Sequence, residues 1–417
     1  MVINMTSSMK VNSSYRWVIL IINFIICAMA YAGLTMWSMA SEDLAVTFEI
    51  SAVQASIGSG ILMAGYAVGS YVEATLTNKI GYRGAGLLGL VLMVIGTIGI
   101  PLAGNYNLIL FLRFLQGWGI LWLVGVNSSV AWFPAKQRGL ASGVIGGGLT
   151  LGIGCGGWVA TGLTNLAGTW QGAFSIWGIV IAIVSVIWAI LMKEPPKDLY
   201  PADIEVKEEA PVHKRINPFA TIACWLCILI LFFNCWQLIG FNSILANCLK
   251  DFGYSAEQAS TAVLLAGLIG VISTPVGGTI SDGLVKKGWI PLKARVFTTA
   301  VPGFLVATVT TILFPVLAKS SFGVACLMSI LCGWGVPVTN ATSGVLPMDL
   351  LQDEDAAGRM FGANILIGCG GGGILAPVIS TAVAESWGWK ACFIVLAAGA
   401  LIGVVISLLL PKFKVRK

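Results

Sequence analysis

Residues 51–56 read Ser-Ala-Val-Gln-Ala-Ser, and residues 255–260 read Ser-Ala-Glu-Gln-Ala-Ser, 204 positions later. Each copy stands at the start of a long apolar segment. Further matches follow in the same order at shifts between 204 and 219: Asn78 with Asp282, Gly117-Trp-Gly119 with Gly333-Trp-Gly335, and Ile153-Gly-Cys-Gly-Gly157 with Ile367-Gly-Cys-Gly-Gly371. An ordered series of matches indicates that the chain contains two copies of one unit.

The composition indicates that this duplicated chain folds in a membrane. Of its 417 residues, 57% are hydrophobic and only 10% are charged, whereas soluble domains carry about 25% charged residues. The net charge is +6, but so few charges cannot coat a soluble surface. The composition therefore disfavours a soluble enzyme, a nucleic-acid-binding protein and a disordered chain.

Twelve apolar segments are long enough to cross a bilayer, which needs about 20 residues per helix. They cover residues 17–40, 52–76, 84–103, 107–132, 138–164, 170–192, 218–247, 258–280, 295–318, 321–348, 358–384 and 390–410. A charged, Pro-containing stretch over 193–217 separates the first six from the last six and is typical of a linker. We therefore expect an all-α membrane protein with twelve transmembrane helices. It would have a six-helix bundle over 1–192, a linker over 193–217 and a second bundle over 218–417, around a central cavity.

The basic residues predict the orientation in the membrane. Twenty of the 24 Lys and Arg lie in the N-terminal head, in loops that follow even-numbered segments, or in the C-terminal tail. By the positive-inside rule, both termini and the linker are cytoplasmic. The first segment lacks a small-residue cleavage site, so we expect it to be retained as a helix. Short loops indicate a prokaryotic plasma membrane, in which we expect a monomer surrounded by lipid.

The loop after the second segment resembles a signature of the major facilitator superfamily, roughly G-x-L-a-D-R-x-G-R-R. Here the stretch reads Ala74-Thr-Leu-Thr-Asn78-Lys79-Ile-Gly81-Tyr-Arg83, so Asn78 replaces the acid and Ala74 the glycine. The second copy, Gly278-Thr-Ile-Ser-Asp282, keeps both. The pattern R-x-x-x-G-x-G of the fourth segment matches Arg113-Phe-Leu-Gln-Gly117-Trp-Gly119. The resemblance covers the whole chain and implies a secondary transporter that moves a small solute by alternating access.

The resemblance also implies a charged cytoplasmic latch that takes part in gating. We expect Glu73 to supply the negative charge that Asn78 lacks. The gating candidates are Glu73, Asn78, Lys79, Gly81, Arg83, Gly278, Asp282, Arg138 and Arg359.

A finer resemblance concerns the substrate. Residues 132–143, Trp-Phe-Pro-Ala-Lys-Gln-Arg-Gly-Leu-Ala-Ser-Gly, are similar to the corresponding loop of small-anion branches: oxalate/formate and monocarboxylate antiporters, and nitrate/nitrite and cyanate porters. The sequence departs from them because segments 2, 8 and 11 carry no central Lys or Arg. The resemblance implies a small organic or inorganic anion, carried by an exchanger, facilitator or symporter.

Arg113 is the one full charge placed well inside a predicted segment. An arginine in that position costs about 2.5–3.5 kcal/mol on insertion scales and therefore faces the bundle interior. Two interpretations remain open. Arg113 anchors an anionic substrate, or it binds backbone carbonyls of neighbouring helices in a structural or gating role.

Segments 1, 4, 7 and 10 are rich in amides and aromatic side chains, and in the family these segments line the central cavity. The alternative is hydrogen bonding between helices, worth about 0.6 kcal/mol on average. Together with Arg113, the candidates for substrate contact are Tyr31, Trp37, Trp118, Trp122, Asn127, Asn234, Gln237, Asn242, Trp334, Asn340 and Ser343.

Several residue types are missing from the predicted segments. No Asp, Glu or His lies in the middle of one, so strong proton coupling through a buried carboxylate is not expected. The ten Cys lie in or at the ends of apolar runs and are typical of packing residues, so we expect no metal, cofactor or catalytic centre. The alternatives are a transporter of a neutral sugar or drug-like amphiphile and a solute sensor derived from a transporter. The Gly-rich segments 5 and 11 predict close, mobile contacts between the halves.

Overall fold

The computed structural model describes residues 14–134, 137–196, 218–344, 346–351 and 360–413, and over these ranges the chain is helical without a strand. The first half contains α1 (Tyr15–Phe48), α2 (Ala52–Gly99), α3 (Tyr106–Trp118), α4 (Trp122–Ala131), α5 (Arg138–Ala167) and α6 (Trp170–Leu191). The second half contains α8 (Ile222–Asp251), α9 (Ala256–Lys286), α10 (Pro291–Thr298), α11 (Val306–Leu317), α12 (Phe322–Ser343), α13 (Leu346–Leu351) and α15 (Gly370–Leu409). Two π-helical turns, η5 (Thr299–Leu305) and η6 (Asn364–Cys369), interrupt the second half. The predicted all-α class is confirmed.

The duplicated Ser-x-x-Gln motif is a capping box in both halves. Ser51 Oγ accepts a hydrogen bond from the Gln54 amide at 3.1 Å, and Gln54 Oε1 accepts one from the Ser51 amide at 2.8 Å. Ser255 and Gln258 form the same pair of bonds at 3.2 and 3.0 Å. Both pairs satisfy backbone donors that have no partner at a helix start, so the repeated sequence begins α2 and α9 in the same way.

Ten helical segments of the described residues are long and apolar enough to cross a membrane. Two of them, Ala52–Leu102 with 51 residues and Met360–Lys412 with 53, are far longer than the roughly 20 residues of one crossing. Each bends at a glycine with positive φ, Gly81 at 74° and Gly388 at 79°, a conformation that side chains with a β-carbon disfavour. Each is long enough for two crossings, and the number twelve stays a prediction.

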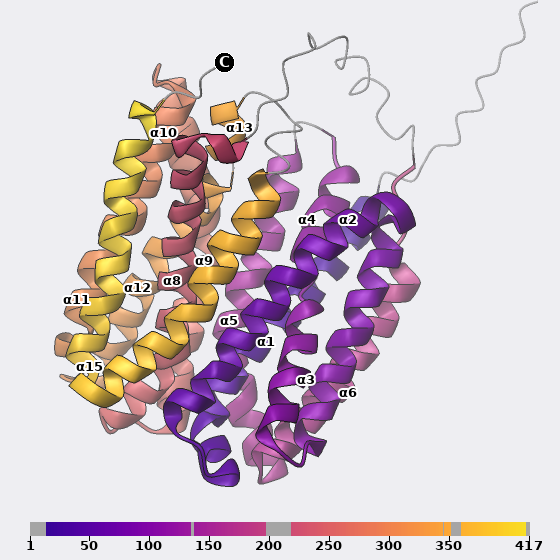
Figure 1. The fold of residues 1–417 in the computed structure, drawn as a ribbon, viewed down its shortest axis with the longest axis vertical. Helices are drawn as coiled ribbons and strands as arrows, with labels where there is room; N and C mark the ends of the chain where they lie inside the picture. Colours follow the sequence, from indigo (N-terminus) through magenta and orange to yellow (C-terminus); the bar gives the residue numbers. More distant parts are fainter. Residues whose placement is uncertain (1–13, 135–136, 197–217, 345, 352–359, 414–417) are drawn as a thin grey trace, which may run out of the picture.

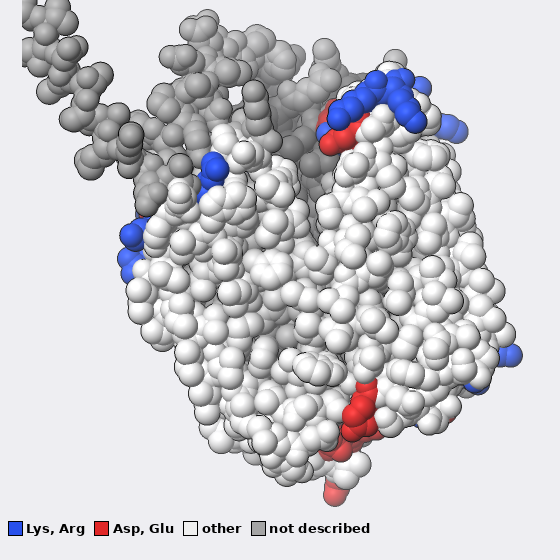
Figure 2. Space-filling view, turned by 180° about the vertical axis from the view of Figure 1, so that it is seen from behind, with Lys and Arg blue, Asp and Glu red and all other residues white. Residues whose placement is uncertain are grey.

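Figure 1 shows α1 to α6 packed together on one side and α8 to α15 on the other. The start of α1 and the end of α15 lie at the same end, called here the terminal end. The other end is called the opposite end. Figure 2 shows a belt without charged side chains across the middle of the visible face, as a bilayer requires. The domain limits at 192 and 218 stay a prediction, and residues 197–217 of the linker lie outside the described residues.

The halves meet chiefly where α5 packs on α9 and where α2 packs on η6 and α15, with further contacts between α1 and α8. A β-carbon placed on Gly154 of α5 would lie 2.7 Å from Gly267 Cα of α9, and one on Gly60 of α2 would lie 2.8 Å from the Ile374 carbonyl oxygen. Glycine lets helix backbones approach this closely. The Gly-rich segments 5 and 11 therefore do lie between the halves, each against a different partner.

Candidate functional site

The two halves separate at the terminal end. Between Gly146 and Gly157, α5 packs against α9. Nearer the terminal end, a β-carbon on Gly143 of α5 or on Gly278 of α9 would meet no atom within 4 Å. Figure 2 shows the corresponding notch between the halves at its upper edge. Among the described residues, α5 and α9 therefore do not touch at these two glycines.

Polar bonds between α1 and α8 hold the halves together at the opposite end. Lys250 Nζ lies 3.2 Å from Glu42 Oε2, and Asn247 Nδ2 donates to Ser41 Oγ at 3.0 Å. Each bond joins the end of α1 in the first half to the end of α8 in the second. These bonds join the halves at this end, and the sequence did not predict them because no pattern marks a pair 208 positions apart.

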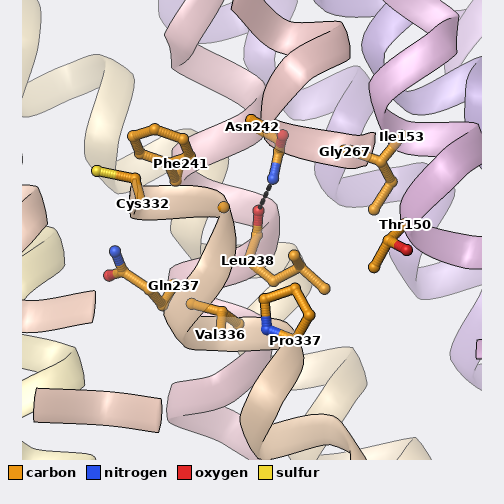
Figure 3. A pocket seen from close by; sticks show the side chains of 12 residues that line it. Thr150, Ile153, Gln237, Leu238, Phe241, Asn242, Gly267, Cys332, Val336 and Pro337 are labelled. Carbon is orange, nitrogen blue, oxygen red and sulfur yellow. Dashed lines mark hydrogen bonds between the residues drawn. The ribbon is translucent and has the colours of Figure 1, made fainter. Parts of the chain in front are cut away.

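A narrow cavity of about 20 Å³, room for about one water molecule, lies between the halves. Thr150 and Ile153 of α5 line it from the first half, and α8, α9 and α12 line it from the second (Figure 3). Its polar side chains on α8 are Gln237 and Asn242, both predicted as substrate contacts. A cavity at the boundary between repeats, built from helices of both, is where transporters of duplicated architecture bind their substrates.

Gln237 and Asn242 each use their amide nitrogen and leave their carbonyl oxygen without a donor. Gln237 Nε2 donates to Thr311 Oγ1 at 2.6 Å, and Asn242 Nδ2 donates to the Leu238 carbonyl at 2.8 Å, the dashed line in Figure 3. Both oxygens are buried and lack a partner. Because buried polar atoms are rarely left unpaired, these two acceptors on residues that line the cavity need an explanation.

The remaining second-half candidates do not line this cavity. Asn234 is fully buried and donates to the carbonyl of Val336, a residue of the cavity wall, at 3.4 Å. Ser343 Oγ is buried without a partner near the end of α12. Trp334 and Asn340 are half-buried on the same helix.

Tyr31, on α1 of the first half, belongs to a cluster at the boundary. Its ring centroid lies 6.0 Å from that of Tyr66 and 6.5 Å from that of Trp122. The same apolar cluster contains Cys235 of α8 and Cys369 of η6, whose sulfur atoms are 2.9 Å apart. The structure thus brings Tyr31 and Trp122 together against the second half.

Three further first-half candidates are placed differently. Asn127 is exposed on α4. Trp118 packs over Gly69 of α2, and its Nε1 is buried without a partner. Trp37 is fully buried and donates from Nε1 to the Ala55 carbonyl at 2.9 Å.

Arg113 ties three helices together. Its side chain is 0% exposed. Nε donates to the Gly58 carbonyl of α2 at 3.1 Å, and Nη1 donates to the Gly33 carbonyl of α1 at 3.1 Å. Nη1 also donates to Gln116 Oε1 at 2.6 Å, and the guanidinium lies 4.6 Å from the Trp37 ring centroid. These contacts agree with the interpretation in which Arg113 binds backbone carbonyls of neighbouring helices, although Nη2 has no partner.

The bend at Gly81 divides α2 into two legs. The turn between these legs is bonded to α6 by residues other than those expected for the latch. Arg83 Nε donates to the Ala189 carbonyl at 3.1 Å, and the Arg83 amide donates to Glu194 Oε1 at 2.8 Å. Glu194 also lies against Gly81, while Asn78 and Lys79 are exposed. Glu194, just beyond α6, is therefore the acid of this latch.

The prediction that Glu73 supplies the latch charge is wrong. Glu73 is 0% exposed, and neither of its carboxyl oxygens has a hydrogen-bond partner. Glu73 stands near the end of its predicted segment and was therefore not expected to lie inside the membrane. The helix continues beyond it to the Gly81 bend, so the carboxyl lies inside the bundle.

The remaining gating candidates are placed as follows. Arg138 donates from Nε to the Phe133 carbonyl at 3.4 Å, at the start of α5. Gly278 and the exposed Asp282 lie near the end of α9, and Asp282 pairs with no basic residue in the described part of the chain. An ion pair of this region joins Arg295 of α10 to Asp349 of α13. Arg359 lies outside the described residues.

Asn364 is a buried amide that the sequence analysis did not select. It is fully buried at the start of η6, and both polar atoms of its side chain lack a partner. π-Helical turns are frequent at functional sites. An amide within an apolar run marks such a residue. Asn364 lies in segment 11, however, outside segments 1, 4, 7 and 10, in which substrate contacts were expected.

The described residues contain no group of three or more His, Cys, Asp and Glu placed to hold a metal ion. Cys224 and Cys227, which are spaced as a CxxC motif, are buried side by side on α8 as free thiols.

Two helical bundles with a cavity between them, joined by polar bonds at one end, are the architecture of a membrane transporter built from repeats. The chain belongs to the Major Facilitator Superfamily, whose family model matches residues 19–374.

Three relatives are named as transporters of anionic solutes. The chain is 25% identical over 271 residues to the hexuronate transporter of Bacillus subtilis (strain 168), and this alignment covers 62% of each chain. It is 23% identical over 365 residues to the probable galactarate/D-glucarate transporter GarP of Escherichia coli (strain K12), covering 78% of this chain and 81% of that one. It is 24% identical over 258 residues to the probable nitrate/nitrite transporter NarK2 of Mycobacterium tuberculosis, covering 59% and 62%.

A solved structure has the same fold. A bacterial homologue of the human lysosomal transporter Spinster, in an inward-facing and occupied conformation, matches with a TM-score of 0.72. The match covers 95% of this chain and 97% of that chain at 16% identity.

Proposed function

We propose that this protein carries a small organic anion across the prokaryotic plasma membrane by alternating access, and that the substrate is a hydroxylated sugar acid. The terminal end faces the cytoplasm in this proposal, because the basic residues of loops, head and tail gather there. The structure then corresponds to a state open to the cytoplasm.

The observation that carries the proposal is a pair of unpaired acceptors on two residues that line the cavity between the halves. The carbonyl oxygens of Gln237 and Asn242 lack donors, and the hydroxyl groups of a sugar acid supply donors. Rocking of one half against the other exposes such a cavity to each side of the membrane in turn. The named substrates of two relatives, hexuronate and galactarate or D-glucarate, belong to this chemical class.

Arg113 supports an anion over a neutral or cationic solute. Among the residues described, no carboxylate pairs with its guanidinium. A positive charge without a counter-ion in a low-dielectric bundle produces a positive potential over several ångströms. In this proposal Arg113 attracts the anion through that potential and holds α1, α2 and α3 in place, with Nη2 as the remaining donor.

Uptake into proteoliposomes tests the proposal. The panel contains radiolabelled D-glucuronate, D-glucarate, lactate, nitrate and D-glucose, with and without the same compound inside, for the wild type and Arg113→Ala. We expect D-glucuronate or D-glucarate uptake that internal substrate accelerates and that Arg113→Ala reduces at least tenfold. Uptake of D-glucose alone would contradict the anion and support the neutral-sugar alternative. Saturable binding without uptake would support a sensor.

A further inference from the structure

Glu73 is the acidic side chain that the described residues bury completely, and the latch does not use it. Both carboxyl oxygens lack a hydrogen-bond partner. Ser70, one turn earlier on α2, is also fully buried with its hydroxyl unpartnered. Such a carboxyl group needs an explanation, because an unpaired buried polar group is costly and a buried charge is costlier.

The carboxyl group lies where the second leg of α2 meets the link between α3 and α4. A β-carbon on Gly89 would overlap Glu73 Oε1 and would lie 2.6 Å from Leu121 Cδ2. A β-carbon on Gly119 would overlap the Gly89 carbonyl oxygen. The missing side chain at Gly89 thus leaves the space that the Glu73 carboxyl occupies.

The fourth apolar segment is broken at this point. The sequence predicts one helix over 107–132, but α3 ends at Trp118 and α4 begins at Trp122. No side chain caps the start of α4. The Trp122 amide donates to the Ile120 carbonyl at 2.7 Å, and the amides of Leu123 and Val124, which have no helical acceptor, carry a partial positive charge. An uncapped helix start and an unpartnered carboxyl group therefore lie beside each other.

No described cation neutralises Glu73. On the second leg of α2, Arg83 bonds Ala189, and on α3 Arg113 bonds Gly33 and Gly58. The remaining elements packed on α2 offer no charge to it. α4 and α6 contain no ionisable residue, and the ionisable residues of α15, Glu385, Lys390 and Cys392, stand around its Gly388 bend at the opposite end. On α1, Arg16 lies over the Trp17 and Phe133 rings and Tyr31 lies against Tyr66, and Cys369 of η6 contacts Cys235. In these surroundings the neutral, protonated carboxyl group has a lower free energy than the charged carboxylate.

We propose that Glu73 is a proton-binding site that couples transport to proton movement through the break between α3 and α4. This inference rests on the proposed transport function and adds the coupling ion and its residue. The bound species is a proton because a metal cation would need several oxygen ligands, whereas Leu121 and Gly89 surround the carboxyl. The step is the dissociation of the Glu73 carboxylic acid into a carboxylate and a proton, which passes to water entering from the open end.

The break gives the proton a route to the substrate cavity. After ionisation the carboxylate requires donors, and the free amide groups at the start of α4 supply them. Movement of α4 onto the carboxylate shifts Trp122, whose ring lies 6.5 Å from that of Tyr31. Tyr31 belongs to the cluster that contacts Cys235 and Cys369 of the second half. The protonation state of Glu73 thus acts on the boundary between the halves.

Infrared spectroscopy of the reconstituted full-length protein tests proton binding without any substrate. We expect the wild type to show, at neutral pH, a protonated carboxylic acid band that disappears in Glu73→Gln. The matched control is Glu385→Gln, since Glu385 is exposed at the opposite end, and this variant should keep the band. Glutamine mimics the protonated acid in size and charge, so the variant should fold. Identical spectra of wild type and Glu73→Gln would overturn the proposal.

Transport then tests the coupling with D-glucuronate as the probe. An inward proton gradient should accelerate uptake by the wild type and by Glu385→Gln. In Glu73→Gln the acceleration of uptake by this gradient should be at least tenfold smaller. Exchange of internal for external D-glucuronate, which moves no net proton, should persist in Glu73→Gln. Retained acceleration in Glu73→Gln would overturn the coupling, and so would equal loss of uptake and exchange. If the wild type carries no panel compound, the proposed function fails, and the infrared result still decides proton binding.

Discussion

Lys250 Nζ of α8 lies 3.2 Å from Glu42 Oε2 of α1, so one ion pair connects the two halves at the opposite end. This bond must break before the protein can open at the opposite end. Both side chains are partly exposed, at 20% for Lys250 and 57% for Glu42. An exposed ion pair contributes up to about 1 kcal/mol, which is enough to bias two conformations about fivefold without locking either.

Removal of this ion pair should shift the protein towards the state open at the opposite end. We expect Lys250→Met to raise that population up to about fivefold, since the lost energy is about 1 kcal/mol or less. Distances between spin labels placed at the opposite end of each half measure the shift. The charge-swapped double variant Lys250→Glu with Glu42→Lys should restore the wild-type distribution. Equal distributions in wild type and Lys250→Met would show that the pair does not act as a gate.

A methyl group at Gly154 should block movement between the halves. Its β-carbon would lie 2.7 Å from Gly267 Cα, where backbone cannot yield. We expect Gly154→Ala to lower D-glucuronate exchange at least tenfold. Gly162→Ala, on the same helix with open space around it, should retain wild-type exchange. Comparable exchange in both variants would contradict a tight contact between α5 and α9.

Arg113→Lys separates charge from geometry. Lysine keeps the positive charge but cannot bond the Gly33 and Gly58 carbonyls in the same forked arrangement. We expect a lower thermal unfolding temperature, with a loss of about 2 kcal/mol or more since hydrogen bonds to charged groups are broken. Preference for D-glucuronate over D-glucose should persist. A variant as stable as the wild type would argue against the structural role.

Gln237→Leu removes one free acceptor from the cavity and keeps the side-chain volume similar. A neutral hydrogen bond contributes about 0.5–1.5 kcal/mol, so we expect KM for D-glucuronate to rise about fivefold. Gln171→Leu, on α6 and away from the cavity, provides the control. An unchanged KM in Gln237→Leu, measured by initial rates of uptake, would remove Gln237 from the substrate site.

The sequence predicted the parts of the fold that follow from hydropathy and repetition. Apolar segments about 20 residues long define helices in a bilayer, and the Ser51–Gln54 and Ser255–Gln258 motifs predicted equivalent helix starts. The break of the fourth segment at residues 119–121 was not predictable in this way. Gly119 packs on the Gly89 carbonyl, and such tertiary contacts leave no trace in a hydropathy profile.

The candidate site was predicted in part for a related reason. Gln237 and Asn242 stood out because amides in apolar segments seek partners, and both line the cavity. Glu73 was misplaced because its distance from Gly81 along the chain suggested a surface position. Its burial depends on the missing side chain at Gly89, which only packing shows.

The contact between Gly154 and Gly267 joins bare backbone to bare backbone beside Thr150 and the cavity. Because neither residue has a side chain, no rotamer has to change when the helices turn against each other. Such a contact can serve as a pivot at the level of the substrate. Rotation about this point swings the two ends of the bundle widely while the bound molecule stays almost still.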